Sequence, residues 1–215
     1  MSAEYEIEPV PGLPENLPAG ESILWQGSPD WRSLSMRLFR LRLVVAYFAA
    51  LLLWRMVETG GDLAQLGRAL VITSTLAALS VGVLTLLGWL MARSTLYTIT
   101  NRRVVIRAGV ALPAAVNLPF RGIAAASLRS YEDGTADVPL RLRDDQRVGY
   151  FLVWPHARPG HFSRPEPMLR CVPDGNEVAR ILSRALAVAH SQVVPATAET
   201  VSAAATAPHG AIAIA

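Results

Sequence analysis

The fold is decided by the stretch Tyr97-Thr-Ile-Thr-Asn-Arg-Arg-Val-Val-Ile-Arg-Ala-Gly109. Apolar and polar residues alternate from Tyr97 to Arg107, which is the period of a half-buried pair of strands. The segment directly before it, Ala69 to Ala92, is about 24 residues long and carries no charge. A run of that length and composition can cross a bilayer with some tilt. The sequence therefore predicts a β module that is joined to the end of a membrane helix, with arginines at the junction.

The composition indicates a hybrid of a folded domain and a membrane element. The chain has 215 residues, of which 52% are hydrophobic and 17% are charged. This is too apolar for an ordinary soluble domain and too charged for a bundle made of membrane helices alone. The formal net charge is only +3, so the placement of the arginines matters more than their number. Cys171 is the sole cysteine, which excludes an intrachain disulfide bond and a cysteine metal cluster.

A shorter apolar run, Leu43 to Trp54, precedes the long one. Its uncharged core falls short of the roughly 20 residues that a membrane span needs. Counted from Leu38, with Arg40, Arg42 and Arg55 reaching towards lipid headgroups, it is long enough. A buried helix of a globular domain and an interfacial helix are the alternatives. We expect a membrane span, because a second helix that forms a hairpin with the long run is the simplest partner for it.

Charge placement predicts the orientation of this hairpin. Arginines flank its two outer ends, whereas the connection between the runs has two arginines balanced by two acidic residues. Positive residues stay on the cytoplasmic side of a membrane, so both termini should be cytoplasmic. The outer arginines are Arg32, Arg37, Arg40, Arg42, Arg93, Arg102, Arg103 and Arg107.

After the hairpin the periodicity changes to that of strands, followed by one amphipathic helix from Val178 to Ala189. This order, without β-α-β alternation, predicts a mainly-β domain, a bent antiparallel sheet or barrel capped by a C-terminal helix. A short strand at Ile23–Trp25 could join the same sheet. The predicted strands are Tyr97–Arg107, Ala115–Pro119, Ile123–Tyr131, Val138–Arg143, Tyr150–Trp154 and Met168–Val172.

The predicted organisation has five parts. They are a disordered N-terminal arm (1–20), a lead-in with a short strand (21–37), a two-helix transmembrane hairpin (38–92), a β domain (93–190) and a disordered tail (191–215).

Three segments carry a resemblance to known proteins. Tyr97–Gly109 resembles the opening hairpin of bacterial pleckstrin-homology-like (PH-like) domains, and Asn117-Leu-Pro-Phe-Arg-Gly-Ile123 resembles their next strand. Trp25-Gln-Gly-Ser-Pro29, ahead of a membrane hairpin, resembles the lead-in of membrane-tethered members. The whole layout, from about residue 4 to 190, is similar to the PuhB family, which assists assembly of the photosynthetic reaction centre and its core antenna in purple bacteria.

The resemblance implies a PH-like fold, no catalytic residues and no cofactor. It also implies a multi-pass protein of the bacterial cytoplasmic membrane, inner or intracytoplasmic. The expected partners are reaction-centre or core-antenna subunits, membrane lipid and a second copy of the chain, and we expect no nucleic-acid partner.

The remaining polar residues give little support to pigment binding or catalysis. The four histidines, His156, His161, His190 and His209, lie outside both apolar runs, so a stable pigment ligand within a span is not expected. His156 and His161 are predicted to be exposed loop residues rather than a metal site. Cys171 is predicted to be a buried small residue, and Asp144-Asp145 a turn. We therefore expect no enzyme and no metal site.

Two surfaces are candidates for binding. Arg93, Arg102, Arg103 and Arg107 could hold anionic headgroups or an acidic partner, although the simpler reading is that they only fix the topology. The strand period places Arg103 and Arg107 on one face and Arg102 on the other. Small residues at Ser74, Ala78 and Gly82 allow close helix packing, either within the chain or against another chain.

Two functions follow as hypotheses. The first is a non-enzymatic assembly factor that makes transient contacts at the membrane. The alternative is a membrane-tethered PH-like module that binds lipid headgroups or a partner and is unrelated to photosynthesis.

Overall fold

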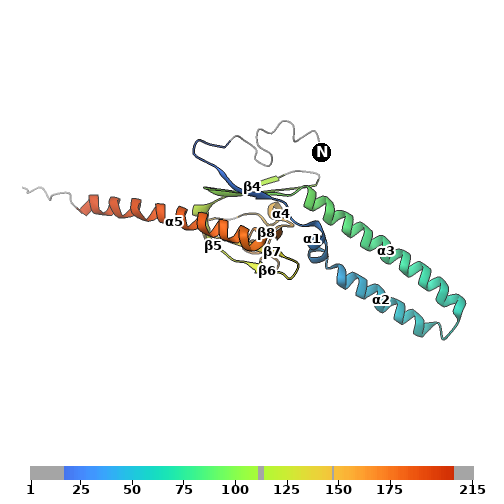
Figure 1. Cartoon of the computed structure of the whole chain (residues 1–215). Coiled ribbons are helices and arrows are strands. Elements are labelled where there is room, and N and C mark those ends of the chain that lie inside the picture. Colours follow the sequence, from blue (N-terminus) through green and yellow to red (C-terminus); the bar gives the residue numbers. More distant parts are fainter. Residues whose placement is uncertain (1–16, 111–113, 147, 206–215) are drawn as a thin grey trace, which may run out of the picture.

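A computed structural model describes residues 17–110, 114–146 and 148–205. It has two antiparallel sheets, a pair of long helices that project from them, and a C-terminal helix that lies across them (Figure 1). The predicted disordered arm lies largely outside the described residues, as does the last part of the predicted tail.

The first sheet has the strand order β1-β2-β3-β4. β2 (Leu96–Thr100) and β3 (Arg103–Ala108) form the hairpin that the alternating sequence predicts, with Tyr97 opposite Ile106. β4 (Ala114–Pro119) extends it on one side. β1 (Ile23–Gly27) pairs with β2 on the other side, which confirms that the lead-in strand belongs to this sheet.

The second sheet is built around β7 (Thr135–Leu142), which pairs with β5 (Ile123–Ala126), β6 (Arg129–Ser130) and β8 (Met168–Pro173). The short 3-10 turn η2 (Phe120–Gly122) separates β4 from β5 and ends the first ladder. Among the described residues no strand pair joins the two sheets, so of the two predicted forms, bent sheet or barrel, a closed barrel is not found, and the mainly-β domain has two antiparallel sheets.

Both sheets and the C-terminal helix α5 (Gly175–Ala205) share one hydrophobic core. Val178 and Leu182 of α5 are fully buried against it, so the predicted capping helix is confirmed. The helix continues to Ala205, whereas the sequence analysis assigns residues from 191 onwards to a disordered tail. Alanine is the strongest helix former, and this segment is rich in it despite its lack of an amphipathic period.

One predicted strand is wrong. The segment Tyr150–Trp154 forms the single-turn helix α4 (Tyr150–Val153). A short apolar run has no period that distinguishes a strand from a buried helical turn, and here one residue of the turn, Val153, is buried in the core.

Three helices connect β1 to β2. α1 (Trp31–Leu38) starts at Asp30, whose side chain accepts a hydrogen bond from the backbone N–H of Ser33 at 2.8 Å. α2 (Leu41–Glu58) and α3 (Leu63–Arg93) follow and pack side by side, projecting away from the sheets (Figure 1). The described chain thus contains a helical pair inserted between two neighbouring strands.

Within the described residues, α3 is the one helix that is long and apolar enough to cross a membrane. Its most apolar 18-residue window has a mean hydropathy of 2.2, and only 6% of that window is buried. The shorter α2 has only 18 residues, and three of them, Arg42, Arg55 and Glu58, are charged. The structure therefore supports one candidate span, and the second span remains a proposal.

Candidate functional site

The four arginines that the sequence singles out do not meet at one place. Arg93 ends α3 and Arg107 lies in β3 opposite Leu96, so both lie at the helix end of the β2–β3 hairpin. Arg102 and Arg103 lie at its other end, at the turn between the strands. The length of β2 separates the two pairs by roughly 15 Å. The predicted arginine site is thus divided in two.

Arg103 is engaged within the chain. Its guanidinium donates two hydrogen bonds to the Glu21 carboxylate, from Nε to Oε1 at 2.7 Å and from Nη2 to Oε2 at 3.0 Å. Burial alone would raise the pKa of Glu21, but the hydrogen bonds from Arg103 and Thr100 outweigh it and lower this pKa. Arg102 donates to the carbonyl oxygen of Ala19 at 3.3 Å. Both arginines therefore hold the segment before β1 against the hairpin.

Arg103→Ala should lower the free energy of unfolding by about 1–3 kcal/mol, because the Glu21 carboxylate, 2% exposed, would lose its charged partner. Arg102→Ala, which removes one long hydrogen bond to a carbonyl oxygen, should cost less than 1 kcal/mol. Chemical denaturation of the detergent-solubilised protein measures both values. Equal effects of the two substitutions would contradict the structural role of the Arg103–Glu21 pair.

The small-residue stripe of α3 lies on an exposed part of the helix. Ser74, Ala78 and Gly82 are exposed, and no heavy atom of the described chain lies within 4 Å of a Cβ built at Gly82. α3 packs instead through buried positions that include Thr73 and Gly88. The stripe therefore lies where another helix could reach it.

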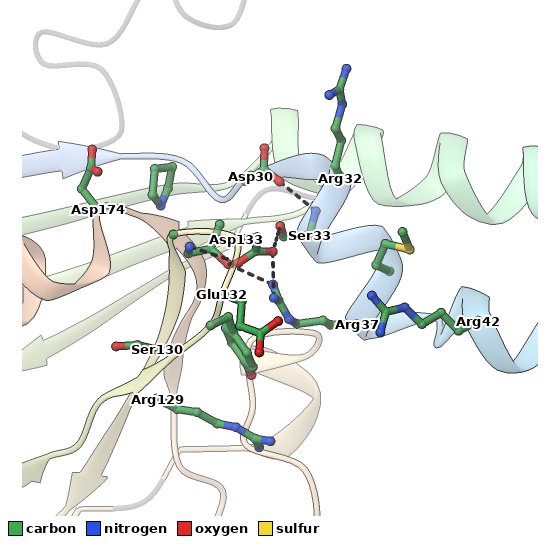
Figure 2. A pocket seen from close by; sticks show the side chains of 15 residues that line it. Asp30, Arg32, Ser33, Arg37, Arg42, Arg129, Ser130, Glu132, Asp133 and Asp174 are labelled. Atoms are coloured by element: carbon green, nitrogen blue, oxygen red, sulfur yellow. Dashed lines mark hydrogen bonds and ion pairs between the residues drawn. The ribbon is translucent and has the colours of Figure 1, made fainter.

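A deep basic surface that the sequence analysis did not identify lies between the start of α2 and the second sheet. We call it the arginine groove. Its cavity volume is about 810 Å³, and His161 and Asp137 also line it. A second cavity of about 980 Å³ adjoins it and shares some of its residues (Figure 2). The arginines of the groove are Arg37, Arg40, Arg42, Arg129, Arg158 and Arg170.

Arg37 fixes α1 to the second sheet at the edge of this groove. Its guanidinium donates to the Asp133 carboxylate at 2.7 Å and to Thr135 Oγ1 at 2.9 Å, and its Cζ lies 3.6 Å from the centre of the Tyr131 ring (Figure 2). Burial alone would raise the pKa of Asp133, but hydrogen bonds from Ser33, Thr135 and Arg37 lower it well below its usual range. Asp133 is therefore ionised at neutral pH and neutralises Arg37.

The single carboxylate lining the arginine groove, Asp137, also has fixed partners. It accepts hydrogen bonds from the Tyr131 hydroxyl at 2.7 Å and from the backbone N–H of Cys171 at 2.8 Å. Burial and the hydrogen bond to Asp137 raise the pKa of Tyr131 to about 12, so this hydroxyl stays protonated and donates. The carboxylate is held by the sheet rather than directed at an arginine.

Four groove arginines lack an acidic partner among the described residues. Arg158 is paired with Glu166 at 2.7 Å, and Arg37 with Asp133. Arg40, Arg42, Arg129 and Arg170 have no salt bridge to any carboxylate in that part of the chain. Their positive charges are arranged around a cavity, so they can attract an anion.

Arg170 is the most buried of these four, with 8% of the residue exposed. Its Nη1 donates to the Pro155 carbonyl oxygen at 2.8 Å. A guanidinium has five N–H donors, and a buried charge without an anionic partner is costly. The groove therefore holds at least one fixed arginine whose charge is not balanced by a salt bridge.

The prediction that His156 is exposed is wrong, because the residue is only 1% exposed. Its Nδ1 lies 2.7 Å from the Tyr97 hydroxyl, and its Nε2 lies 3.1 Å from Thr95 Oγ1. The Thr95 hydroxyl donates its proton to the Met91 carbonyl oxygen, and the Tyr97 hydroxyl oxygen accepts a hydrogen bond from the backbone N–H of Arg170. The network is satisfied when a neutral imidazole carries its proton on Nε2.

Burial, with the nearby positive charge of Arg170, lowers the pKa of His156 to about 3. The neutral ring links the end of α3, strand β2 and strand β8 through hydrogen bonds. His156 is a structural residue of the domain.

Two other predictions about reactive residues are confirmed. Cys171 is fully buried, and burial raises the pKa of its thiol to about 11, so it is protonated at neutral pH. Asp144 and Asp145 lie in a turn, where Asp144 pairs with Arg164. In the described ranges no group of three or more histidine, cysteine, aspartate or glutamate residues could hold a metal ion.

The comparisons with known proteins agree with this architecture. The sequence model of the bacterial PH domain family matches residues 39–186, which include the projecting helices α2 and α3, strands β2 to β4 of the first sheet and the whole second sheet. A protein of Rhodobacter capsulatus described as an uncharacterized 23.7 kDa protein in the puhA 5' region is 40% identical over 187 residues, covering 85% of this chain and 87% of the relative. No solved structure matches the chain. These findings confirm the resemblance to PuhB-like proteins, and the chain belongs to the bacterial PH domain family.

Proposed function

We propose that the protein is a non-enzymatic assembly factor for the photosynthetic reaction centre and its core antenna, acting through transient contacts at the cytoplasmic membrane. The relative from a photosynthetic bacterium is placed in the puhA 5' region, which supports a role related to photosynthesis. The structural observation that carries the proposal is an exposed apolar helix, α3, joined directly to a folded PH domain. Such a protein can contact both the membrane spans and the cytoplasmic segments of a partner subunit.

In this proposal α2 and α3 cross the membrane as a hairpin with both chain termini in the cytoplasm. α2 packs along α3, and its 18 residues give a length of about 27 Å, close to the thickness of the hydrocarbon core. Arg42 near the start of α2 and Arg93 at the end of α3 lie at the same end of the hairpin, which favours a cytoplasmic position for that end.

The stripe Ser74, Ala78 and Gly82 is the proposed contact with a partner span. It is exposed along α3, and small residues let a second helix approach closely. A span of a reaction-centre or core-antenna subunit is the proposed occupant. A second copy of this chain is the competing occupant, and crosslinking distinguishes the two.

Gly82→Leu combined with Ala78→Leu should reduce crosslinking of the protein to reaction-centre or antenna subunits at least fivefold, because the added side chains hold a partner helix away. The fold of the chain should be unchanged, since Gly82 has no neighbour among the described residues. Val83→Phe, which adds bulk at an exposed position of another face, is the matched control. An equal loss in the control would contradict a specific docking face.

Deletion of the gene tests the proposed function in the native bacterium. Reaction-centre and core-antenna levels should fall, while the chemistry of the pigments should be unaltered. Crosslinking and affinity capture from photosynthetic membranes should recover a subunit of one of these complexes. Normal levels of both complexes in the deletion strain would overturn the proposal and favour the alternative, a membrane-tethered PH-like module unrelated to photosynthesis.

A further inference from the structure

We propose that the arginine groove binds the headgroup of an anionic phospholipid that carries two phosphate groups. The site is distinct from the arginines of the β2–β3 hairpin and from the small-residue stripe of α3. It rests on the membrane insertion proposed above, but not on the identity of the protein partner.

The position of the groove favours a lipid. Arg42 and Leu43, in the first turn of α2, line the cavity, and Arg40 directly precedes that helix. If α2 enters the bilayer here, one wall of the groove lies at the level of the phosphate layer. Basic pockets at the cytoplasmic end of membrane helices are suited to anionic headgroups.

The charge of the groove favours two phosphates rather than one. Four arginines of the groove lack salt bridges among the described residues: Arg40, Arg42, Arg129 and Arg170. Asp137 is the single carboxylate of the lining, and it is not paired with an arginine. These five groups give a net formal charge of +3. A phosphodiester with a single negative charge would leave most of that charge unbalanced. Guanidinium groups also bind phosphate oxygens through two parallel hydrogen bonds.

The geometry provides both fixed and adjustable donors. Arg170 is buried and held by the Pro155 carbonyl oxygen, and the Arg129 Cζ lies 5.4 Å from the centre of the Tyr131 ring. Figure 2 shows Arg37 and Arg42 reaching from the helices, with Arg129 on the strand side. A cavity of about 810 Å³ lies within the size range of small-ligand sites. The headgroup would therefore bridge the membrane helices and the second sheet.

An acidic protein segment carries the same negative charge as a lipid headgroup, but it fits the position of the arginine groove less well. The first turn of α2 lines the groove. A lipid headgroup could bind there while its acyl chains stay in the bilayer, whereas a peptide would have to run along the membrane surface. Glu132 lines the adjoining cavity and faces the same region, so it would repel either ligand (Figure 2). Binding of an acidic peptide is therefore one of the results that the experiment distinguishes.

The experiment uses the delipidated full-length protein in a neutral detergent, titrated with cardiolipin, phosphatidylglycerol or inorganic pyrophosphate and observed by native mass spectrometry. Arg40→Gln combined with Arg42→Gln should weaken cardiolipin binding roughly 10- to 30-fold, since each arginine near an anionic surface adds about fivefold. These side chains have no hydrogen bond or salt bridge to the rest of the described chain, so the fold should be retained. Arg121→Gln combined with Arg184→Gln removes the same charge from exposed positions outside the groove and should change binding less than twofold.

Three results would overturn the proposal. Equal weakening in the groove and control variants would mean that only the total charge matters. Binding of pyrophosphate as tight as that of cardiolipin would identify a soluble phosphate as the ligand. Displacement of cardiolipin by a short poly-glutamate peptide at equal concentration would identify an acidic segment. Unchanged reaction-centre levels in a deletion strain would not bear on this site, so the failure of the two proposals can be told apart.

Discussion

Gly88→Leu is expected to separate α1 from α3 and to lower the free energy of unfolding by on the order of 3 kcal/mol. A Cβ at position 88 would lie 2.0 Å from the Ser35 hydroxyl oxygen and 3.0 Å from the Ser35 Cα, so a side-chain rotation alone cannot relieve the clash. α1 would have to move, and with it the Asp30 N–H that donates to the Cys171 carbonyl oxygen at 2.8 Å. Thermal or chemical unfolding followed by tryptophan fluorescence measures the loss.

Gly82→Leu is the matched control for this substitution, because the same helix receives the same side chain at an exposed position. It should leave stability within about 0.5 kcal/mol of the parent, apart from the gain in helix propensity. Adding Ser35→Gly to Gly88→Leu removes the clashing hydroxyl and Cβ and should recover part of the stability. Equal stability of the two leucine variants would mean that α1 does not pack on α3 as described.

Stability is expected to fall as the pH is lowered from 7 to 5, because of His156. Its pKa is about 3 in the folded chain and near 6.5 when unfolded, so in this window the unfolded state binds a proton that the folded state does not. The contribution of the neutral ring is complete above pH 6.5 and decreases as the pH falls towards 3. The expected loss between pH 7 and pH 5 is about 2 kcal/mol.

His156→Gln should reduce this pH dependence, because glutamine does not titrate. It should also lower stability at pH 7 by about 3 kcal/mol, since the buried Tyr97 hydroxyl loses a partner of matching shape. His161→Gln, the same substitution at a less buried loop position, is the matched control. Carboxylates with lowered pKa values, such as Asp133, affect stability only at more acidic pH. Retention of the full pH dependence in His156→Gln would show that another group causes it.

The sequence was sufficient wherever a signal lies within one short segment. The alternation from Tyr97 to Arg107 predicted the β2–β3 hairpin, and the uncharged run up to Ala92 predicted α3. The amphipathic period after residue 178 predicted the start of α5. Each of these patterns lies within one run of consecutive residues, so it can be recognised from the spacing of apolar and polar positions alone.

The sequence was insufficient where residues from distant segments meet. His156 looked like a loop residue because its partners, Thr95 and Tyr97, lie about 60 positions earlier. Arg103 looked available because its partner Glu21 is 82 residues away. The same holds for the arginine groove, which combines α1, the start of α2, the second sheet and the loop before β8. The one early signal was the cluster of arginines at positions 37–42, which the positive-inside rule already explained.

The pairing of β1 with β2 has a mechanical consequence. These strands are neighbours in the first sheet, with Gly27 opposite Tyr97, yet all three helices lie between them in the chain. The folded domain is thus attached to the helical pair at two adjacent points rather than through one flexible linker. In the proposed membrane insertion, the height of the domain above the bilayer and the direction it faces would therefore be set by the fold. A partner of the proposed kind would then have to present its cytoplasmic segment at that height, so the fold would select partners by their geometry as well as by their surface.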